Sequence, residues 1–424
     1  MVDRFADHPT APGASSAAPP DGPRVLYLVN GFPWPLTSGY LRHYHAIREL
    51  SARGHRITLM AIVSSDFRPE DRAALEPFTE RTVTVESTRR SRSLRHRATR
   101  RLGAMSIGES AARRLRGEVA EAVREVPYDV VLFSGKRTFP ALAAARAVPV
   151  VADVCDATSS RLRGNLRYAS IGRFPLLVAE YLEVRWIERA LLRRAVHLLF
   201  ASARDRDALV DPPGWDRATV LPNGVDLEYW QRPDGIGLGR GEIVFTGGMA
   251  YPPNDDAARF LIHEILPRVR AEVPDAHLSI VGRDPGPKLI AAGRAPGVTV
   301  TGLVPDVRPY LTAASVYAAP LRFGAGIQNK LLEALAMGVP TVASPNGVGG
   351  LVTTEGIRPP ITVVTPRDPA RFAAALVAGL RAAESDPMPP SEGRAFVARH
   401  FTWARSGELL DAVLRDAASG TAQR

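Results

Sequence analysis

The chain has 424 residues, too many for one ordinary domain and suited to two domains of about 150–200 residues each. Hydrophobic residues make up 45% and charged residues 23% of it, which excludes a largely disordered, collagen-like or disulfide-framework protein. A single cysteine, Cys155, excludes an internal disulfide and predicts a reducing, cytoplasmic location. Residues 1–22 lack the layout of a signal peptide and predict a disordered tail, and no apolar run reaches the roughly 18 residues of a transmembrane helix.

The positive charge of the chain is carried almost entirely by arginine. The formal net charge is +10, and only three lysines occur, Lys136, Lys288 and Lys330. One interpretation is the coding bias of a GC-rich genome. The other is a functional cluster, because residues 88–101 hold seven arginines among fourteen residues. The basic segment 88–116 predicts peripheral contact with an anionic membrane at its inner face, and the lack of interleaved aromatic residues argues against a nucleic-acid partner.

Short apolar runs alternate with longer amphipathic segments along the whole chain, a pattern that predicts parallel α/β architecture. The first run, Val25–Val29, predicts a buried strand, and the loop NGFPWPLTSG follows it. A helix after this loop carries apolar residues on one face and stops at Gly54. Further strands are expected at 57–63, 129–135, 148–154, 197–202, 242–248, 277–282, 298–302, 316–321, 340–344 and 361–364.

The strands form two series, and a Gly- and Pro-rich stretch at 231–241 marks a linker between them. The fold class expected is therefore α/β with two doubly wound, Rossmann-like domains and a ligand cleft at the carboxyl ends of the strands. The first domain is placed at 23–230 and the second at 242–390. A final helix within 391–424 is expected to pack back on the first domain.

One segment has the form of a phosphate-binding loop. A strand ends near Leu321, Gly324 and Gly326 make a tight turn, and a helix starts near Gln328. Backbone N–H groups at such a helix start carry partial positive charge and bind phosphate. Arg322 and Lys330 flank the turn, and Glu333, one turn into the helix, is suited to bind hydroxyl groups. The alternative is an ordinary strand–turn–helix whose glycines only relieve crowding.

This segment, PLRFGAGIQNKLLEALAMG, resembles the donor-site signature of glycosyltransferase family 4, the retaining nucleotide-sugar transferases with a GT-B fold. Other pieces agree in order and spacing: GFPWPLTSGYLRHYH, LPNGVDLEYW, FTGGMAYPPNDDAARF, LSIVGRDP and VTVTGLVPDVRPYL. The resemblance spans residues 24–410. It implies transfer of a sugar from a nucleotide-diphosphate donor to a saccharide or small-molecule acceptor, with no protein nucleophile, cofactor or metal.

The resemblance also implies which residues bind the donor. Positive charge and N–H donors would stabilise the departing diphosphate, Glu333 would contact the ribose, and the base would lie near Val304. Gly39 is expected to let the backbone approach the diphosphate. The remaining donor-site residues in this interpretation are Gly248, Arg283, Arg322, Gly324, Gly326, Ile327 and Lys330. One departure is Ala325, which stands where the family motif has its first glutamate; another is the absence of basic residues in GGMAYPPND.

The acceptor side is expected around VADVCDATSSRLRG, which follows a strand and ends in polar residues. Asp153 or Asp156 would orient the acceptor hydroxyl or take its proton, although Asp156 is equally suited to cap the following turn. His43, in the first helix, is the third catalytic candidate.

Several other functions are weighed against transfer. The pair Asp205 and Asp207 has the spacing of a metal-binding motif but opens a helix, where acidic residues are favoured, and no histidine and cysteine spacing suits zinc. A nucleotide-sugar epimerase and a non-catalytic basic binding protein on the same fold are the alternative functions. The epimerase requires acid and base pairs that the sequence does not supply.

Overall fold

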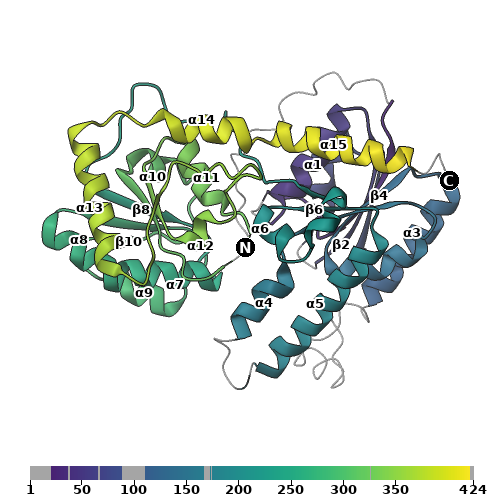
Figure 1. Cartoon of the computed structure of the whole chain (residues 1–424), viewed down its shortest axis with the longest axis horizontal. Helices are drawn as coiled ribbons and strands as arrows, with labels where there is room; N and C mark the ends of the chain where they lie inside the picture. Colours follow the sequence, from purple (N-terminus) through teal and green to yellow (C-terminus); the bar gives the residue numbers. More distant parts are fainter. Residues whose placement is uncertain are drawn as a thin grey trace. The chain divides into compact units, whose positions relative to one another are not determined.

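The computed structural model describes residues 21–36, 39–64, 67–87, 110–166, 172, 174–324 and 326–420. Residues 1–20 of the tail expected at 1–22, residues 88–109 of the basic segment 88–116, and Ala325 lie outside these residues. The chain divides into two compact units (Figure 1). Among the described residues, the second unit is Asn223–Thr402, and the first consists of those in 21–222 together with 403–420.

The first unit is a seven-stranded sheet in the order β3-β2-β1-β4-β5-β6-β7, with every neighbouring pair parallel. Its strands are β1 (Arg24–Asn30), β2 (Arg56–Val63), β3 (Arg81–Glu86), β4 (Val130–Ser134), β5 (Val150–Cys155), β6 (His197–Phe200) and β7 (Ala218–Val220). Its α-helices are α1 (Leu41–Ala52), α3 (Ser110–Glu125), α4 (Thr158–Leu166), α5 (Phe174–Arg194), α6 (Ala203–Asp207) and α15 (Trp403–Ser419). Short 3₁₀ helices are η1 (Pro69–Ala74), η2 (Glu76–Phe78), η4 (Lys136–Ala144) and η5 (Pro212–Arg217).

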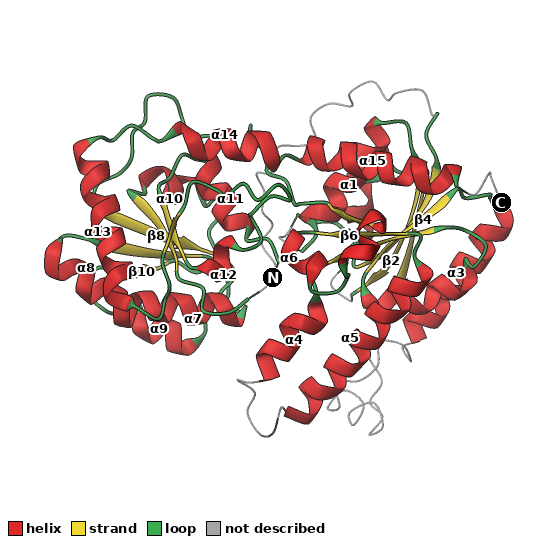
Figure 2. Cartoon of the chain, viewed as in Figure 1, coloured by secondary structure: helices red, strands yellow, loops and turns green. Residues whose placement is uncertain are grey.

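Helices cover both faces of this sheet (Figure 2). Successive side chains of a strand point to opposite faces. Tyr27 therefore packs in the core that contains residues of α1 and α15, whereas Leu26 and Leu28 pack in the core that contains residues of α3, η4 and α5. Burial on both faces explains why the central strands read as continuous apolar runs in the sequence.

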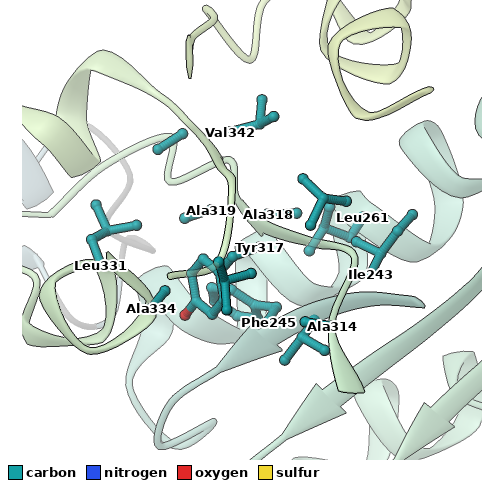
Figure 3. Packing of buried hydrophobic residues seen from close by; sticks show 14 of the residues in the cluster. Ile243, Phe245, Leu261, Ala314, Tyr317, Ala318, Ala319, Leu331, Ala334 and Val342 are labelled. Carbon is teal, nitrogen blue, oxygen red and sulfur yellow. The ribbon is translucent and has the colours of Figure 1, made fainter. Parts of the chain in front are cut away.

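The second unit is a six-stranded parallel sheet in the order β10-β9-β8-β11-β12-β13. Its strands are β8 (Glu242–Thr246), β9 (His277–Val281), β10 (Val298–Val300), β11 (Val316–Ala319), β12 (Thr341–Ala343) and β13 (Thr362–Val363). Its helices are α7 (Pro252–Phe260), the π-helix η6 (Leu261–Ile265), α8 (Leu266–Glu272), α9 (Pro287–Ala292), α10 (Arg308–Ala313), α11 (Asn329–Ala336), α12 (Pro345–Val348), α13 (Pro369–Ser385) and α14 (Ser391–His400). Figure 3 shows the core, where Phe245 and Tyr317 pack with small side chains such as Ala318 and Ala334. The predicted α/β fold class with two parallel-sheet domains is confirmed.

The second unit begins earlier and ends later than the range 242–390 expected from the sequence. Residues 223–230 lie in the second unit, where Val225 bridges to Thr402. The expected linker at 231–241 is tied to the same unit by Arg232, whose guanidinium donates to four carbonyl oxygens, those of Gly237, Leu311, Thr312 and Met337. Helix α14 belongs to the second unit, and only α15 packs on α1 in the first.

Two strands escaped the sequence analysis, β3 and β7. Both are edge strands. β3 reads RTVTVE, with one buried residue among six, and β7 has only three residues. Edge strands need neither a continuous apolar run nor great length, because one side and part of each face remain open to water. A search for continuous apolar runs therefore identifies central strands but not β3 and β7.

Candidate functional site

The strand order of the second unit indicates where a ligand binds. From β8 the chain moves to β9 on one side, and from β11 it moves to β12 on the other. β8 and β11 are neighbours, so the loops that follow them separate at the carboxyl edge of the sheet. In open parallel sheets this switch point is the usual ligand crevice. The loop after β8 begins with Gly247 and Gly248, and the loop after β11 leads through Arg322 to α11.

Two glycines at this edge are required by close packing. Gly247 has φ 151°, and a Cβ there would come within 2.6 Å of the amide nitrogen of Asn254. Gly282, after β9, has φ 145°, and its Cβ would overlap the carbonyl oxygen of Gly247. Gly248, the residue chosen from the sequence, has only Arg283 within ordinary contact distance, at 3.7 Å. The steric requirement for glycine therefore falls on Gly247 and Gly282, which the sequence analysis missed.

Lys330 is held in position at this edge by polar and aromatic neighbours. Its ammonium donates a hydrogen bond to Oδ1 of Asn254 and lies 4.9 Å from the centre of the Phe245 ring. The Asn254 amide in turn donates to the carbonyl of Gly248, at 3.0 Å. Burial lowers the pKa of Lys330 to about 7, although Glu333 opposes the shift. An anion bound here would restore the proton and gain a short-range charge interaction.

Glu333 lies one turn after Lys330 on α11. Burial raises the pKa of its carboxyl to about 7, while Lys330 counteracts the shift. Beneath it Tyr317 is fully buried, and its hydroxyl hydrogen-bonds with Thr246 Oγ1 at 2.9 Å. Burial raises the pKa of Tyr317, and Glu333 adds to the increase. A rigid, closely packed support therefore carries a carboxyl and an ammonium side by side.

Arg322 is already engaged in an ion pair. Its guanidinium binds the Asp256 carboxylate of α7 through two hydrogen bonds, with Nε at 2.7 Å, and lies 5.0 Å from the centre of the Phe260 ring. Its charge is thus shared with Asp256. A diphosphate would have to compete with Asp256 for this side chain, whereas the hydrogen bond of Lys330 goes to the neutral amide of Asn254.

The other expected donor residues are distributed along the same edge. Arg283 is exposed, 3.9 Å from Asp284, and Val304 is partly buried against the core after β10. Gly324 (φ 135°) and Gly326 (φ 74°) have backbones that favour glycine, and Ile327 packs partly buried on the core. The first N–H groups of α11 follow directly, and such groups point out of a helix with partial positive charge.

The structure adds Asn254 and Asp256 to this site. Both come from PPNDDAARF, where the sequence analysis noted only a lack of basic residues. The sequence did offer one indication of Asn254, because two prolines directly before it favour the start of a helix. They place Asn254 in the first turn of that helix. Its pairing with Lys330, 76 positions later, depends on the fold.

In the first unit, Asp153 is engaged in a buried ion pair. Arg42 Nε donates to Asp153 Oδ2 at 2.7 Å and Nη2 donates to Oδ1 at 2.8 Å, while Nη1 donates to the carbonyl of Leu221 at 2.7 Å. Both side chains are buried. Burial alone would lower the pKa of Arg42, but Asp153 raises it above its ordinary value. This arrangement gives Asp153 a structural partner on both oxygens and does not suit it to accept a proton from an acceptor.

His43 is held by Tyr27. The His43 Nδ1 and the Tyr27 hydroxyl are 2.7 Å apart, and burial lowers the pKa of His43 to about 4. The imidazole is therefore neutral at physiological pH, and its low basicity suits it to hydrogen bonding rather than to general-base catalysis. Gly39, shortly before α1, has open space where a Cβ would be built.

Asp156 lies at the start of α4 among other acidic side chains. Its carboxylate accepts from Thr158 Oγ1 at 3.0 Å and faces Arg161 Nε at 3.3 Å, so it contacts side chains at the start of α4. Asp205 accepts from the N–H of Ala157 and from Ser202, so it stabilises this loop and its own helix. Among the described residues no group of three or more His, Cys, Asp and Glu side chains has the arrangement of a metal site.

Within the part of the chain that the structure describes, no helix combines the length and the apolar character needed to cross a bilayer.

Two family models match the chain. A model for glycosyl transferases group 1 matches residues 240–381, which contain the switch-point site, and a glycosyl transferase 4-like domain matches residues 41–224. Together they cover more than half of the sequence.

Curated relatives match over part of their length. Phosphatidyl-myo-inositol mannosyltransferase of Mycobacterium tuberculosis is 32% identical over 198 residues, which are 44% of this chain and 51% of the relative. The enzyme of the same name from Mycobacterium bovis matches equally. The chain thus spans about half the length of the curated relatives it matches.

Solved structures share the fold at low identity. Anabaena HepE, solved with UDP and glucose, is 13% identical, covers 92% of this chain and 99% of its own, and has a TM-score of 0.64. A glycosyltransferase from Rickettsia africae is 12% identical, with 94% and 99% coverage and a TM-score of 0.61. TarM is 9% identical, with 92% and 98% coverage and a TM-score of 0.65. The predicted family is confirmed: the chain belongs to the glycosyltransferase family 4-like group and has the GT-B fold.

Proposed function

We propose that this glycosyltransferase moves a sugar, with retention of its anomeric configuration, from a nucleotide-diphosphate donor to a hydroxyl group of a saccharide, lipid-linked saccharide or small-molecule acceptor. The observation that carries the proposal is Lys330, which Asn254 holds beside Gly247 at the switch point and at the start of α11. HepE, a neighbour in fold, was solved with UDP and glucose, which supports a nucleotide-sugar donor.

Lys330 and the first amides of α11 would bind the donor diphosphate. The diphosphate gains negative charge as its bond to the sugar breaks, so cations and N–H groups placed there stabilise the transition state more than the ground state. The proposed site uses the protein's own cation for this task and requires no metal ion. Glu333, beside Lys330, is proposed to accept hydrogen bonds from the ribose hydroxyls.

The transfer step is proposed to occur on one face of the sugar. The acceptor oxygen bonds to the anomeric carbon on the side from which the diphosphate departs, and the carbon–oxygen bond to the diphosphate breaks with its electron pair going to the phosphate oxygen. The acceptor proton passes to that phosphate. No protein nucleophile takes part. Asp156 and the neutral His43 are proposed to orient the acceptor by hydrogen bonds, whereas Asp153 acts as a positioning residue through Arg42.

A thermal-shift screen against nucleotide diphosphates and their sugars tests the donor site. One nucleotide should raise the melting temperature of the wild type by mass action, and Lys330→Met and Glu333→Gln should lose the response. Lys288→Met is the matched control, because this lysine on α9 is exposed and is not one of the proposed donor-site residues. Equal stabilisation of wild type and Lys330→Met would overturn the assignment.

Product analysis tests the chemistry. With the stabilising donor in hand, mass spectrometry after incubation with phosphatidylinositol vesicles and with soluble polyols identifies which acceptor class gains a sugar. Proton NMR of the product then gives the anomeric configuration. A product with inverted configuration would contradict the proposed step while leaving the donor site intact.

A further inference from the structure

Helix α5 continues beyond the core that it covers. Its buried residues are Val184, Ile187, Glu188 and Leu191, all in its second half. The first half, FPLLVAEYLE, contains no buried residue although it holds the most apolar stretch of the helix. Figure 2 shows α5 beside α4, and this neighbour is the helix that α5 contacts most. An apolar helical segment that finds no core usually marks an interaction surface.

The exposed side chains of α5 form one face. Phe174 is 48% exposed, Leu182 58% and Trp186 51%. Intervals of three and four residues place Leu182, Trp186, Arg189 and Arg193 along the same stripe of a helix. We call the six residues of this stripe the α5 face: Phe174, Leu182, Arg185, Trp186, Arg189 and Arg193.

The α5 face holds three arginines and no acidic residue, and the three glutamates of the helix, Glu180, Glu183 and Glu188, lie outside it. Glu180 is engaged with Lys136 at 3.2 Å, and Glu188 is buried, where it accepts from the N–H of Ser159. The three arginines of the face are exposed, and Arg185 donates to the hydroxyl of Tyr181 on its own helix. Large apolar side chains next to arginines are the pattern of a helix that lies in the plane of a membrane interface.

We propose that the first unit docks on an anionic lipid surface through the α5 face. Phe174, Leu182 and Trp186 would enter the headgroup region, and the arginines would bind lipid phosphates. The positive charge of the α5 face favours an anionic lipid surface over a second copy of this chain. Two copies would bring like charges together, whereas anionic lipids carry the opposite charge. The α5 face contains no residue of the basic segment 88–116. It also goes beyond the proposed function, since docking does not require donor binding or transfer.

Vesicle sedimentation of the full chain tests the inference. The wild type should sediment with phosphatidylcholine–phosphatidylglycerol vesicles and not with pure phosphatidylcholine, and raising the salt concentration should weaken binding. The double variant L182S/W186S and the triple variant R185Q/R189Q/R193Q should each reduce the bound fraction at least tenfold. The matched controls are Ile236→Ser and the triple variant R358Q/R367Q/R371Q, which change exposed residues of the second unit and should bind as the wild type does.

Fluorescence locates the contact. Brominated lipids should quench tryptophan emission of the wild type, and Trp186→Phe should lose most of that quenching. Retained nucleotide stabilisation in every variant shows that the proteins are folded and separates this test from the donor-site test. The inference is overturned if the wild type ignores anionic vesicles, if the α5 variants bind them as well as the controls do, or if sedimentation velocity shows a wild-type dimer that L182S/W186S converts to a monomer.

Discussion

Removing the charge of Asp153 gives the most direct test of how the first unit is built. Asp153→Asn preserves the shape of the side chain but leaves the buried Arg42 guanidinium without its carboxylate. Arg42 also donates to the carbonyl of Leu221, so it cannot leave the interior without breaking that bond too. Breaking a buried ion pair by removing one partner costs about 3–5 kcal/mol, because the remaining charge stays desolvated.

The size of this effect makes the assay simple. For a unit of this length, 1 kcal/mol corresponds to roughly 2–4 °C in melting temperature, so Asp153→Asn should lower it by about 6–20 °C. Urea unfolding should show the same loss in the free energy of unfolding. Asp156→Asn is the control, since both its carboxylate and the Arg161 side chain that it faces are partly exposed. This substitution should cost less than about 1 kcal/mol.

A second variant separates charge from packing. Replacing both partners, Arg42→Met with Asp153→Leu, should recover most of the lost stability, because an apolar pair of similar size carries no desolvation penalty. If Asp153→Asn unfolds at the wild-type temperature but abolishes sugar transfer, the structural role is refuted and Asp153 returns as a catalytic candidate.

Four further outcomes follow from other residues. Nucleotide-diphosphate affinity, measured by calorimetry, should fall as the pH rises through about 7, because the free site loses the Lys330 proton there while the occupied site retains it. An affinity that does not change with pH, or a pH profile that Lys330→Met shares, would contradict this. Burial raises the pKa of Cys155 from 9.0 to about 12, so at pH 8 its alkylation by iodoacetamide should be about a thousandfold slower in the folded protein than in urea, and equal rates would show an accessible thiolate. Gly282→Ala should cost about 1–3 kcal/mol of stability through overlap with Gly247, whereas Gly248→Ala should melt within about 1 °C of wild type; the reverse order would refute the packing argument. Arg232→Met should lower the free energy of unfolding in urea by about 1.5–3 kcal/mol, because four carbonyls lose a charged donor. The exposed Arg240 gives the control variant Arg240→Met, which should be unaffected. If Arg232→Met loses no more stability than this control, the guanidinium does not stabilise residues 231–241.

Local patterns in the sequence were sufficient to predict the central strands of both sheets and the helix α11. Buried strands such as β1 and β8 read as apolar runs, and α11 begins as expected after a glycine turn and ends near Gly338, whose φ of 68° suits a helix terminus. The same spacing placed Lys330 and Glu333 at this helix, and the family resemblance added their expected roles in donor binding. These features depend on residues that lie within about ten positions of one another.

Features formed by distant residues could not be found in this way. Asp153 is a polar residue at a strand end, which is typical of a catalytic group, and only its partner 111 positions away shows that the carboxylate is occupied. Likewise Arg322 was expected to meet phosphate, and Asp256 lies 66 positions before it. In both cases the sequence shows the charge but not the residue that neutralises it.

The discontinuity of the first unit has a consequence for synthesis on the ribosome. Leu410 and Leu414 of α15 complete the core around Tyr27, yet they follow the whole second unit in the chain. Asn223–Thr402 is continuous and can fold as soon as it emerges, whereas the unit that begins first has to wait for residues 403–419. Because Ser406 Oγ donates to the carbonyl of Pro222 at 2.7 Å, the two ends of the gap are adjacent. A short glycine–serine bridge in place of 223–402 would therefore join them and let the first unit fold without delay.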